Sequence, residues 1–244
     1  MMNKIYFFLC LLIMYPMQSI NSQEKTPLDG VNVSELLMHL DWPNMARFDA
    51  QNKEVDSDNT DNRVVFMGNS ITEGWASYMP EMFDNQTYIN RGIGGQTTPQ
   101  MLLRFRQDVI AHQPKVAVIL AGTNDIAGNT PLKDLETVAG HLFSMAELAR
   151  QHDIKVILCS VVPAAEYPWR KGKRPDVKIP QLNKMIQDYC NENKIHYLDY
   201  FIAMTDGNGG LIESYGYDGV HPDEDGYKVM TKLAEKALDQ LLDR

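Results

Sequence analysis

The sequence predicts a three-layer α/β fold, in which helices cover both faces of a mostly parallel sheet of about five strands. Two observations lead to this prediction. From residue 63 to the end, short apolar runs alternate with longer segments of helical period, and this alternation is typical of βαβ units. The central runs are also apolar at consecutive positions, as expected for strands that are buried on both faces.

The apolar runs predict five strands, and the periodic segments between them predict the helices. The strands are expected at residues 64–68, 87–90, 115–121, 155–162 and 195–200. The helices are expected at residues 71–79, 97–113, 130–153, 179–193 and 224–242. In the third of these helices the apolar residues recur every three or four positions, Thr130 can cap the helix, and Pro131 suits its first turn.

Composition and charge exclude some classes of protein. A chain of 244 residues with 44% hydrophobic and 23% charged residues can bury a sizeable core, so disorder is not expected. The net charge is -9, and the longest basic cluster is the short run WRKGKR at 169–174. A surface that follows a phosphate backbone is therefore not expected, and nucleic acid is a poor candidate partner.

The first 22 residues have the shape of a secretory signal peptide. Lys4 is followed by an apolar run from Ile5 to Met14 and then by small and polar residues. This run is too short to span a membrane, so we expect no stable membrane insertion. The mature protein is expected to be exported, to the periplasm or the medium.

The remaining chain divides into an arm with a linker, residues 23–62, and a domain, residues 63–244. We expect the arm to pack on the domain, with Trp42 as its anchor. Cys159 and Cys190 are expected to be buried free thiols. No Cys or His cluster has metal-ligand spacing, so neither a metal nor another cofactor is expected. The sequence does not indicate an oligomeric state.

Ser70 lies in the stretch VVFMGNSITEGW, directly between a predicted strand and a predicted helix. Two roles are open for it. Ser70 is a favoured helix cap, and Glu73 three residues later would complete a capping box. It can also be a nucleophile, since the positive end of a helix favours a developing oxyanion. The G-x-S-x-G elbow of the α/β-hydrolase fold is missing, because Thr72 stands at its second glycine.

A nucleophilic serine needs a base, and His221 is the best candidate. It lies in a Gly- and Pro-rich loop, three residues after Asp218, whose carboxylate could accept the imidazole Nδ1–H. An ordinary turn followed by a helix cap is the alternative for this loop. His112, His141 and His152 instead fall within or at the ends of predicted helices.

Three more loops follow predicted strands and should share the carboxyl edge of the sheet. The loop at 90–100 is rich in glycine, which lets a backbone N–H approach a ligand closely. The loop at 121–128 offers the amide of Asn124 as a donor. The longest loop, residues 162–180, contains Tyr167 and Trp169. A hydroxyl, an Asp/His pair and such donors together are what acyl transfer requires.

In their order and spacing, four blocks resemble the SGNH hydrolases, also called the GDSL esterase/lipase family. The blocks are Gly68-Asn69-Ser70, Gly94 in RGIGGQTT, Asn124 in GTND, and Asp218-x-x-His221. The resemblance covers residue 63 to the end and is strongest to the branch that holds the platelet-activating-factor acetylhydrolase catalytic subunits and exported bacterial acylhydrolases. It implies a flavodoxin-like sheet of order 2-1-3-4-5. One departure is Asn69, where the family usually has Asp.

The resemblance also implies roles for these residues. Ser70, Asp218 and His221 would be catalytic, and the oxyanion hole would be formed by the N–H groups of Ser70 and Gly94 and the amide of Asn124.

We therefore expect a serine esterase that removes a small acyl group, most simply acetyl, from a small-molecule or glycan ester. Tyr167 and Trp169 could stack on a sugar ring. The alternatives are a lysophospholipase or thioesterase, an enzyme that transfers the acyl group to a sugar, and a non-catalytic glycan-binding module on the same scaffold.

Overall fold

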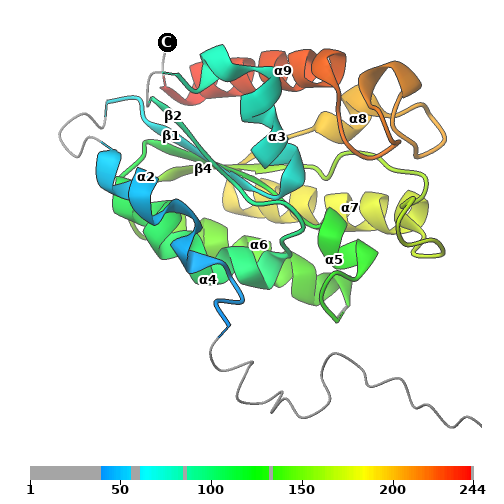
Figure 1. Ribbon diagram of the computed structural model, residues 1–244, viewed down its shortest axis with the longest axis horizontal. Helices are drawn as coiled ribbons and strands as arrows, with labels where there is room; N and C mark the ends of the chain where they lie inside the picture. Colours follow the sequence, from blue (N-terminus) through cyan, green and yellow to red (C-terminus); the bar gives the residue numbers. More distant parts are fainter. Residues whose placement is uncertain (1–39, 56–60, 85–86, 132–133, 243–244) are drawn as a thin grey trace, which may run out of the picture. The chain divides into compact units, whose positions relative to one another are not determined.

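The computed structural model describes residues 40–55, 61–84, 87–131 and 134–242 (Figure 1). All of them except residue 40 belong to one compact unit, Asp41–Arg244. The expected signal peptide, residues 1–22, and the first part of the expected arm lie outside the described residues.

The sheet has the topology that the sequence predicts. Its strands are β1 (Val64–Gly68), β2 (Tyr88–Gly92), β3 (Val116–Leu120), β4 (Lys155–Cys159) and β5 (His196–Leu198). They are all parallel, in the order β2-β1-β3-β4-β5. The α/β fold class and the strand order 2-1-3-4-5 are thus confirmed.

Helices cover both faces of this sheet. They are α2 (Asp49–Glu54), α3 (Ser70–Tyr78), α4 (Thr98–Asp108), α5 (Thr123–Ala127), α6 (Leu135–Arg150), α7 (Pro175–Asn193), α8 (Tyr200–Met204) and α9 (Glu224–Leu242). Short 3₁₀ helices occur at Met45–Phe48, Pro80–Met82, Ile110–His112 and Glu213–Tyr215. Figure 1 shows α3, α8 and α9 on one side of the sheet and α4, α6 and α7 on the other. In the described parts of the chain, no helix combines the length and apolarity needed to cross a membrane.

The two layers of core follow from the alternation of side chains along each strand. In β1, Val64 and Phe66 pack in the cluster that includes residues of α3 and α9. Val65 and Met67 face the opposite cluster, which includes residues of α4, α6 and α7. All four side chains are buried, which explains why the run is apolar at every position.

Two helices begin four or five residues away from their expected starts. α6 begins at Leu135, because Asp134 caps it by accepting a hydrogen bond from the Thr137 N–H (2.7 Å). The hydroxyl of Thr130, which was expected to cap the helix, instead donates to Thr97 Oγ1 (3.3 Å). α7 begins at Pro175 rather than at residue 179, so the loop after β4 is shorter than expected. The one-turn helices α5 and α8 are too short to have a visible period in the sequence.

The two cysteines are buried and unbridged, as expected. Burial raises the pKa of the Cys190 thiol to about 12, so this thiol stays protonated at neutral pH. Cys159 is buried in the sheet, and its pKa is raised further for the same reason. Both side chains therefore act as packing residues of the core rather than as redox-active thiols.

Gly92 allows α3 to lie directly on β2, and we expect its replacement to destabilise the protein. A Cβ atom at Gly92 would lie 2.1 Å from the backbone nitrogen of Glu73. Gly92→Ala should therefore lower the free energy of unfolding by about 1–3 kcal/mol. Gly140 in α6 is the matched control, because a Cβ there meets no atom within 4 Å, and Gly140→Ala should stabilise by about 0.5–1 kcal/mol. Urea unfolding measures both. A wild-type midpoint for Gly92→Ala would show that α3 can move away from the sheet.

Candidate active site

Ser70 stands at the carboxyl end of β1 and is the first residue of α3. The helix is capped by Asn69, whose side-chain oxygen accepts a hydrogen bond from the Ile71 N–H (3.2 Å). Of the two roles left open for Ser70, the capping box with Glu73 is therefore not the one found, because Asn69 is the cap. An asparagine can replace the family's usual aspartate here because capping needs only a side-chain oxygen. The Ser70 hydroxyl is consequently available to a partner outside its own helix.

That partner is His221, which links Ser70 to Asp218. Ser70 Oγ lies 3.0 Å from His221 Nε2, and His221 Nδ1 lies 2.8 Å from Asp218 Oδ2. Asp218 Oδ1 also accepts the N–H groups of Val220 (2.9 Å) and His221 (2.8 Å). An ionised Asp218 that accepts the Nδ1–H directs the Nε2 lone pair toward the Ser70 hydroxyl. The structure thus joins all three predicted catalytic residues.

The environment of Asp218 keeps its carboxyl ionised. Partial burial by itself raises the pKa of this carboxyl, but the hydrogen bonds from the backbone and imidazole of His221 and from Val220 outweigh burial. The pKa of Asp218 therefore lies below its ordinary value, so the carboxylate can hold the imidazole at neutral and mildly acidic pH.

Gly94 lies beside Ser70, but its N–H already has an acceptor. A Cβ atom at Gly94 would lie 3.9 Å from Ser70 Cβ. The Gly94 N–H donates to Glu73 Oε2 (2.9 Å), and Glu73 Oε1 is 3.6 Å from Arg47 Nη2. The backbone donor expected in an oxyanion hole is thus occupied by a carboxylate from the helix that carries Ser70.

Asn124 ties the loop after β3 to the loop that carries Gly94. It is buried in α5, and its side-chain nitrogen donates to the backbone oxygen of Gln96 (3.0 Å). Gly122 makes the turn from β3 into α5 with a φ of 126°, a conformation that favours glycine. Since an amide NH₂ group has two N–H donors, the bond to Gln96 engages one of them.

Three aromatic rings lie next to the imidazole of His221 or support it. The Trp169 and Tyr217 ring centroids are each 5.7 Å from the imidazole centroid. Tyr167 is fully buried, stacks on Trp169 at 5.4 Å, and its hydroxyl contacts Thr123 Oγ1 (2.9 Å). Tyr167 therefore supports Trp169 rather than lining an open surface. The sequence reasoning missed Tyr217, although it directly precedes Asp218.

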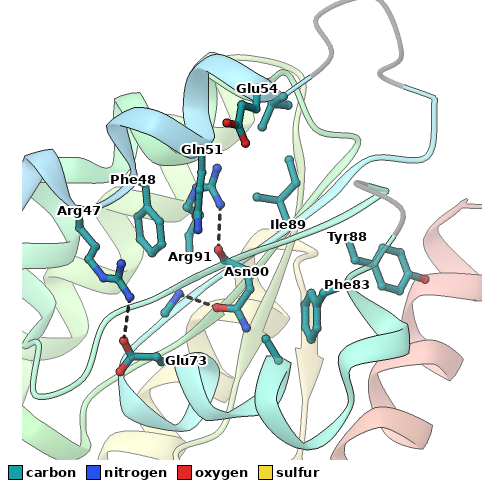
Figure 2. Close-up of a pocket in the computed structure, with 13 residues that line it drawn as sticks. Arg47, Phe48, Gln51, Glu54, Glu73, Phe83, Tyr88, Ile89, Asn90 and Arg91 are labelled. Atoms are coloured by element: carbon teal, nitrogen blue, oxygen red, sulfur yellow. Dashed lines mark hydrogen bonds and ion pairs between the residues drawn. The ribbon is translucent and has the colours of Figure 1, made fainter.

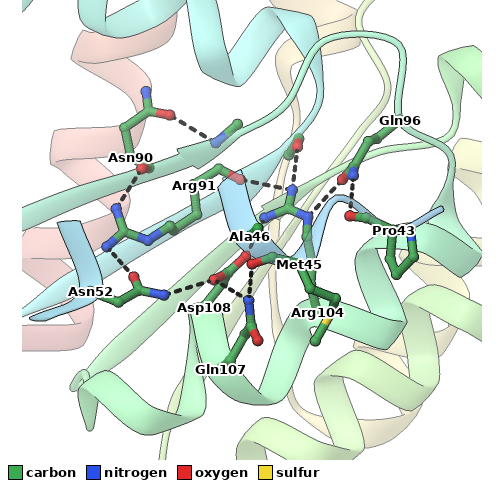
Figure 3. A network of polar contacts seen from close by, with 12 residues as sticks. Pro43, Met45, Ala46, Asn52, Asn90, Arg91, Gln96, Arg104, Gln107 and Asp108 are labelled. Carbon is green, nitrogen blue, oxygen red and sulfur yellow. Dashed lines mark hydrogen bonds and ion pairs between the residues drawn. The ribbon is translucent and has the colours of Figure 1, made fainter. Parts of the chain in front are cut away.

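A buried arginine holds the two strand ends and the Gly94 loop together (Figure 3). Arg104 of α4 is fully buried. Its Nη2 donates to the backbone oxygens of Gly68 (3.1 Å) and Arg91 (2.9 Å). Its Nε donates to Gln96 Oε1 (2.6 Å), and its Nη1 pairs with Asp108 (3.0 Å). One guanidinium thereby fixes the end of β1, the end of β2 and the loop beyond β2.

Residues 41–55, here called the strap, pack on this network. Phe48 is the buried aromatic of the strap, and the Arg91 guanidinium lies over its ring at 4.7 Å. The side chain of Trp42 is 48% exposed. The expectation that Trp42 anchors the arm is therefore wrong. Phe48 anchors it instead, because its ring is buried and makes the cation–π contact with Arg91.

Hydrogen bonds also join the strap to the network (Figure 3). The backbone oxygen of Pro43 accepts a hydrogen bond from Gln96 Nε2 (2.7 Å). Asn52 accepts from Arg91 Nη2 (2.7 Å) and donates to Asp108 Oδ1 (3.1 Å). The strap thus supplies hydrogen-bond partners to buried side chains of β2 and α4, as a part of the domain does.

A cavity of about 340 Å³ lies between the strap, α3 and β2 (Figure 2). Arg47, Phe48, Gln51, Asn90 and Glu73 are among its lining residues. Ser70 and His221 do not line it, so this cavity is not part of the arrangement around Ser70.

Asp125 is a further buried acid at the site, and it has a structural partner. It accepts hydrogen bonds from the Thr98 N–H (3.1 Å) and the Thr98 hydroxyl (2.7 Å). Burial raises the pKa of Asp125 to about 6, although the bonds from Thr98 act in the opposite direction. In the described parts of the chain, no three His, Cys, Asp or Glu side chains gather in a way that could hold a metal ion.

Comparison with known proteins identifies relatives of the whole domain. Residues 66–229 match the model of the GDSL-like Lipase/Acylhydrolase family. Human platelet-activating factor acetylhydrolase IB subunit alpha2 is 27% identical over 208 residues, which cover 80% of this chain and 81% of that protein. A GDSL-like lipase from Bacteroides thetaiotaomicron is 45% identical with a TM-score of 0.78, covering 81% of this chain and 98% of that one.

The same fold occurs in an acetylxylan esterase from Geobacillus stearothermophilus. Its structure has a TM-score of 0.58 at 17% identity, covering 72% of this chain and 94% of that chain. At this identity the likeness concerns the fold alone.

Arg104→Met should strongly destabilise the protein, because it leaves the Asp108 carboxylate buried without its cation. Removing one partner of a buried pair costs about 3–5 kcal/mol, which urea unfolding would measure. Arg106→Met is the matched control, since Arg106 is exposed on the same helix, and it should change stability by less than about 0.5 kcal/mol. Adding Asp108→Leu to Arg104→Met should recover part of the loss. A loss below about 1 kcal/mol for Arg104→Met would contradict the central role of Arg104.

Proposed function

The chain belongs to the GDSL-like lipase/acylhydrolase family, and on that premise we propose that it is a serine esterase that hydrolyses small acyl esters through an acyl-serine intermediate. The observation that carries the proposal is the hydrogen-bonded chain from Ser70 through His221 to Asp218. Such a chain supplies a nucleophile, a general base and a group that orients the base.

In the first step, Ser70 Oγ attacks the ester carbonyl carbon while His221 Nε2 takes the hydroxyl proton. Asp218 stabilises the imidazolium that forms and keeps its orientation. When the tetrahedral intermediate collapses, His221 returns the proton to the alcohol oxygen, and the acyl group remains on Ser70. Water then attacks the acyl-serine, with His221 again acting as the base. The bond between the acyl carbon and Ser70 Oγ breaks, His221 returns the proton to Ser70 Oγ, and the carboxylic acid leaves.

The negative charge on the tetrahedral oxygen needs donors, and three are proposed. They are the N–H groups of Ser70 and Gly94 and the side-chain amide of Asn124. The Gly94 N–H is bonded to Glu73 (2.9 Å), so this carboxylate has to leave the donor before the oxyanion can use it. The side chain of Glu73 is 42% exposed, which supports such a movement.

We propose acetyl as the acyl group and a carbohydrate as its carrier. A similar protein, the platelet-activating factor acetylhydrolase subunit, is named for an acetyl ester. Export through a signal peptide at residues 1–22, based on Lys4 and the apolar run after it, would bring the enzyme to external glycans.

Labelling and turnover test the proposed nucleophile. A fluorophosphonate probe should label the wild-type protein and not Ser70→Ala. The same variant should lose p-nitrophenyl acetate hydrolysis by a factor on the order of 10⁴ or more, because the triad acts as a unit. The wild-type rate should fall from acetate to long-chain esters. Wild-type activity in Ser70→Ala would overturn the proposal, and a preference for long chains would favour a lysophospholipase or thioesterase.

Asn124→Ala tests the proposed oxyanion donors. Removing one such donor costs about 10²–10³ in kcat, measured on p-nitrophenyl acetate with thermal unfolding as a check of the fold. Glu73→Ala is the contrasting variant, since it frees the Gly94 N–H instead of removing a donor, and it should not lose activity. Full activity in Asn124→Ala would show that the donors are assigned wrongly.

A further inference from the structure

The alcohol part of an ester has a defined place at this site, beside the imidazole of His221. In the proposed reaction the Nε2 atom that takes the proton of Ser70 returns it to the departing alcohol oxygen. The side chains around the imidazole are therefore the first that the alcohol meets. This placement rests on the proposed esterase function.

Two exposed aromatic rings stand at that position. Trp169 comes from the loop between β4 and α7, and Tyr217 comes from the loop between the 3₁₀ helix at Glu213–Tyr215 and α9. Trp169 is 45% exposed and Tyr217 is 64% exposed, although both rings lie against the imidazole. Large aromatic surface left in water beside a reactive group is typical of a binding site.

The structure holds both rings in place. The buried Tyr167 stacks on Trp169, and its hydroxyl contacts Thr123. The Tyr217 N–H donates to the backbone oxygen of His221 (3.3 Å), within the loop that also carries Asp218. Because the rings are already held in place, little side-chain conformational entropy is lost when a ligand stacks on them.

The orientation of the rings leaves exposed flat surface rather than a cage. The Tyr217 plane lies at 10° to the imidazole plane, and the Trp169 plane lies at 32°. Cages for quaternary ammonium groups need aromatic faces that surround one point, whereas Tyr217 is nearly parallel to the imidazole and Trp169 is stacked on Tyr167. The exposed surface of Tyr217 and the uncovered part of Trp169 suit the C–H face of a sugar ring.

The charges around the two rings have no common sign. Arg170 and Lys171 follow Trp169 along the chain, whereas Asp218 and Asp223 lie close to Tyr217. A rim that selected a phosphate would be basic on both sides. A ligand whose contacts are mainly apolar faces and hydroxyl groups fits better.

We propose that Trp169 and Tyr217 form a carbohydrate-binding rim, on which sugar rings next to the acetylated sugar stack while the ester lies at Ser70. An oligosaccharide ester presents such neighbouring rings, and a small ester does not. The rim therefore favours oligosaccharide esters over small ones.

The test compares kcat/KM on acetylated xylotriose with kcat/KM on ethyl acetate, which has no ring. Tyr217→Ala and Trp169→Ala should each lower the ratio of the two values roughly ten-fold. Tyr217→Phe and Trp169→Phe keep a flat ring and should change the ratio little. Ile202→Ala, at an exposed residue of α8, is the control for loss of surface hydrophobic area and should leave both values unchanged.

Equal losses on both substrates would overturn the rim, because they would mean that the rings only support His221. Faster hydrolysis of a 2-acetyl glycerophosphocholine, lost in the same variants, would assign the rim to a lipid headgroup and overturn it too.

A binding measurement tests the rim independently of the esterase function. Tryptophan fluorescence of Ser70→Ala should change on titration with acetylated xylotriose, and the change should vanish when Trp169→Phe is added. Binding without any wild-type hydrolysis would support the rim and refute the esterase. Hydrolysis of ethyl acetate without binding of acetylated xylotriose would support the esterase and refute the rim.

Discussion

The buried guanidinium of Arg104 is the constraint on which the candidate site depends. It donates to the last residue of β1, to Arg91 of β2 and to Gln96 in the loop beyond. A buried charge is costly unless it is paired and hydrogen-bonded, so these partners cannot drift apart without leaving the guanidinium unsatisfied. The turn into Ser70 and the loop of Gly94 are therefore fixed relative to each other by the cost of burying one cation.

Close packing of α3 on β2 has a second consequence for the site. Because Gly92 has no side chain, the backbone of Glu73 comes within 2.1 Å of the position that a Cβ atom would take. The same approach brings the Glu73 carboxylate to the Gly94 N–H. The N–H that we propose as an oxyanion donor is thus bonded to a carboxylate in this structure. In the proposed mechanism a substrate has to compete with this carboxylate.

Much of the fold and part of the site could be read from the sequence because their signals are local. Hydrophobic runs mark strands by themselves, since a strand between two helical layers is apolar on both faces. Asp218 and His221 are three residues apart, so one loop is enough to bring them together, and the parallel topology carries Ser70 to the same edge. The glycine-rich loop at 90–100 and the amide of Asn124 were visible as candidate donors, but only the family resemblance selected Gly94 and implied the oxyanion role for both residues.

The sequence by itself therefore determined the α/β class, the strands and the Ser70, Asp218 and His221 set. Only the tertiary structure showed which of several similar residues anchors the strap and which aromatic ring lies beside the imidazole. Phe48 rather than Trp42 anchors the strap, because Arg91 of β2 lies over its ring. Tyr217 reaches the imidazole through the fold of its loop, and no periodicity marks it. Such contacts join residues far apart in the chain, and their energy depends on packing geometry that a local pattern does not contain.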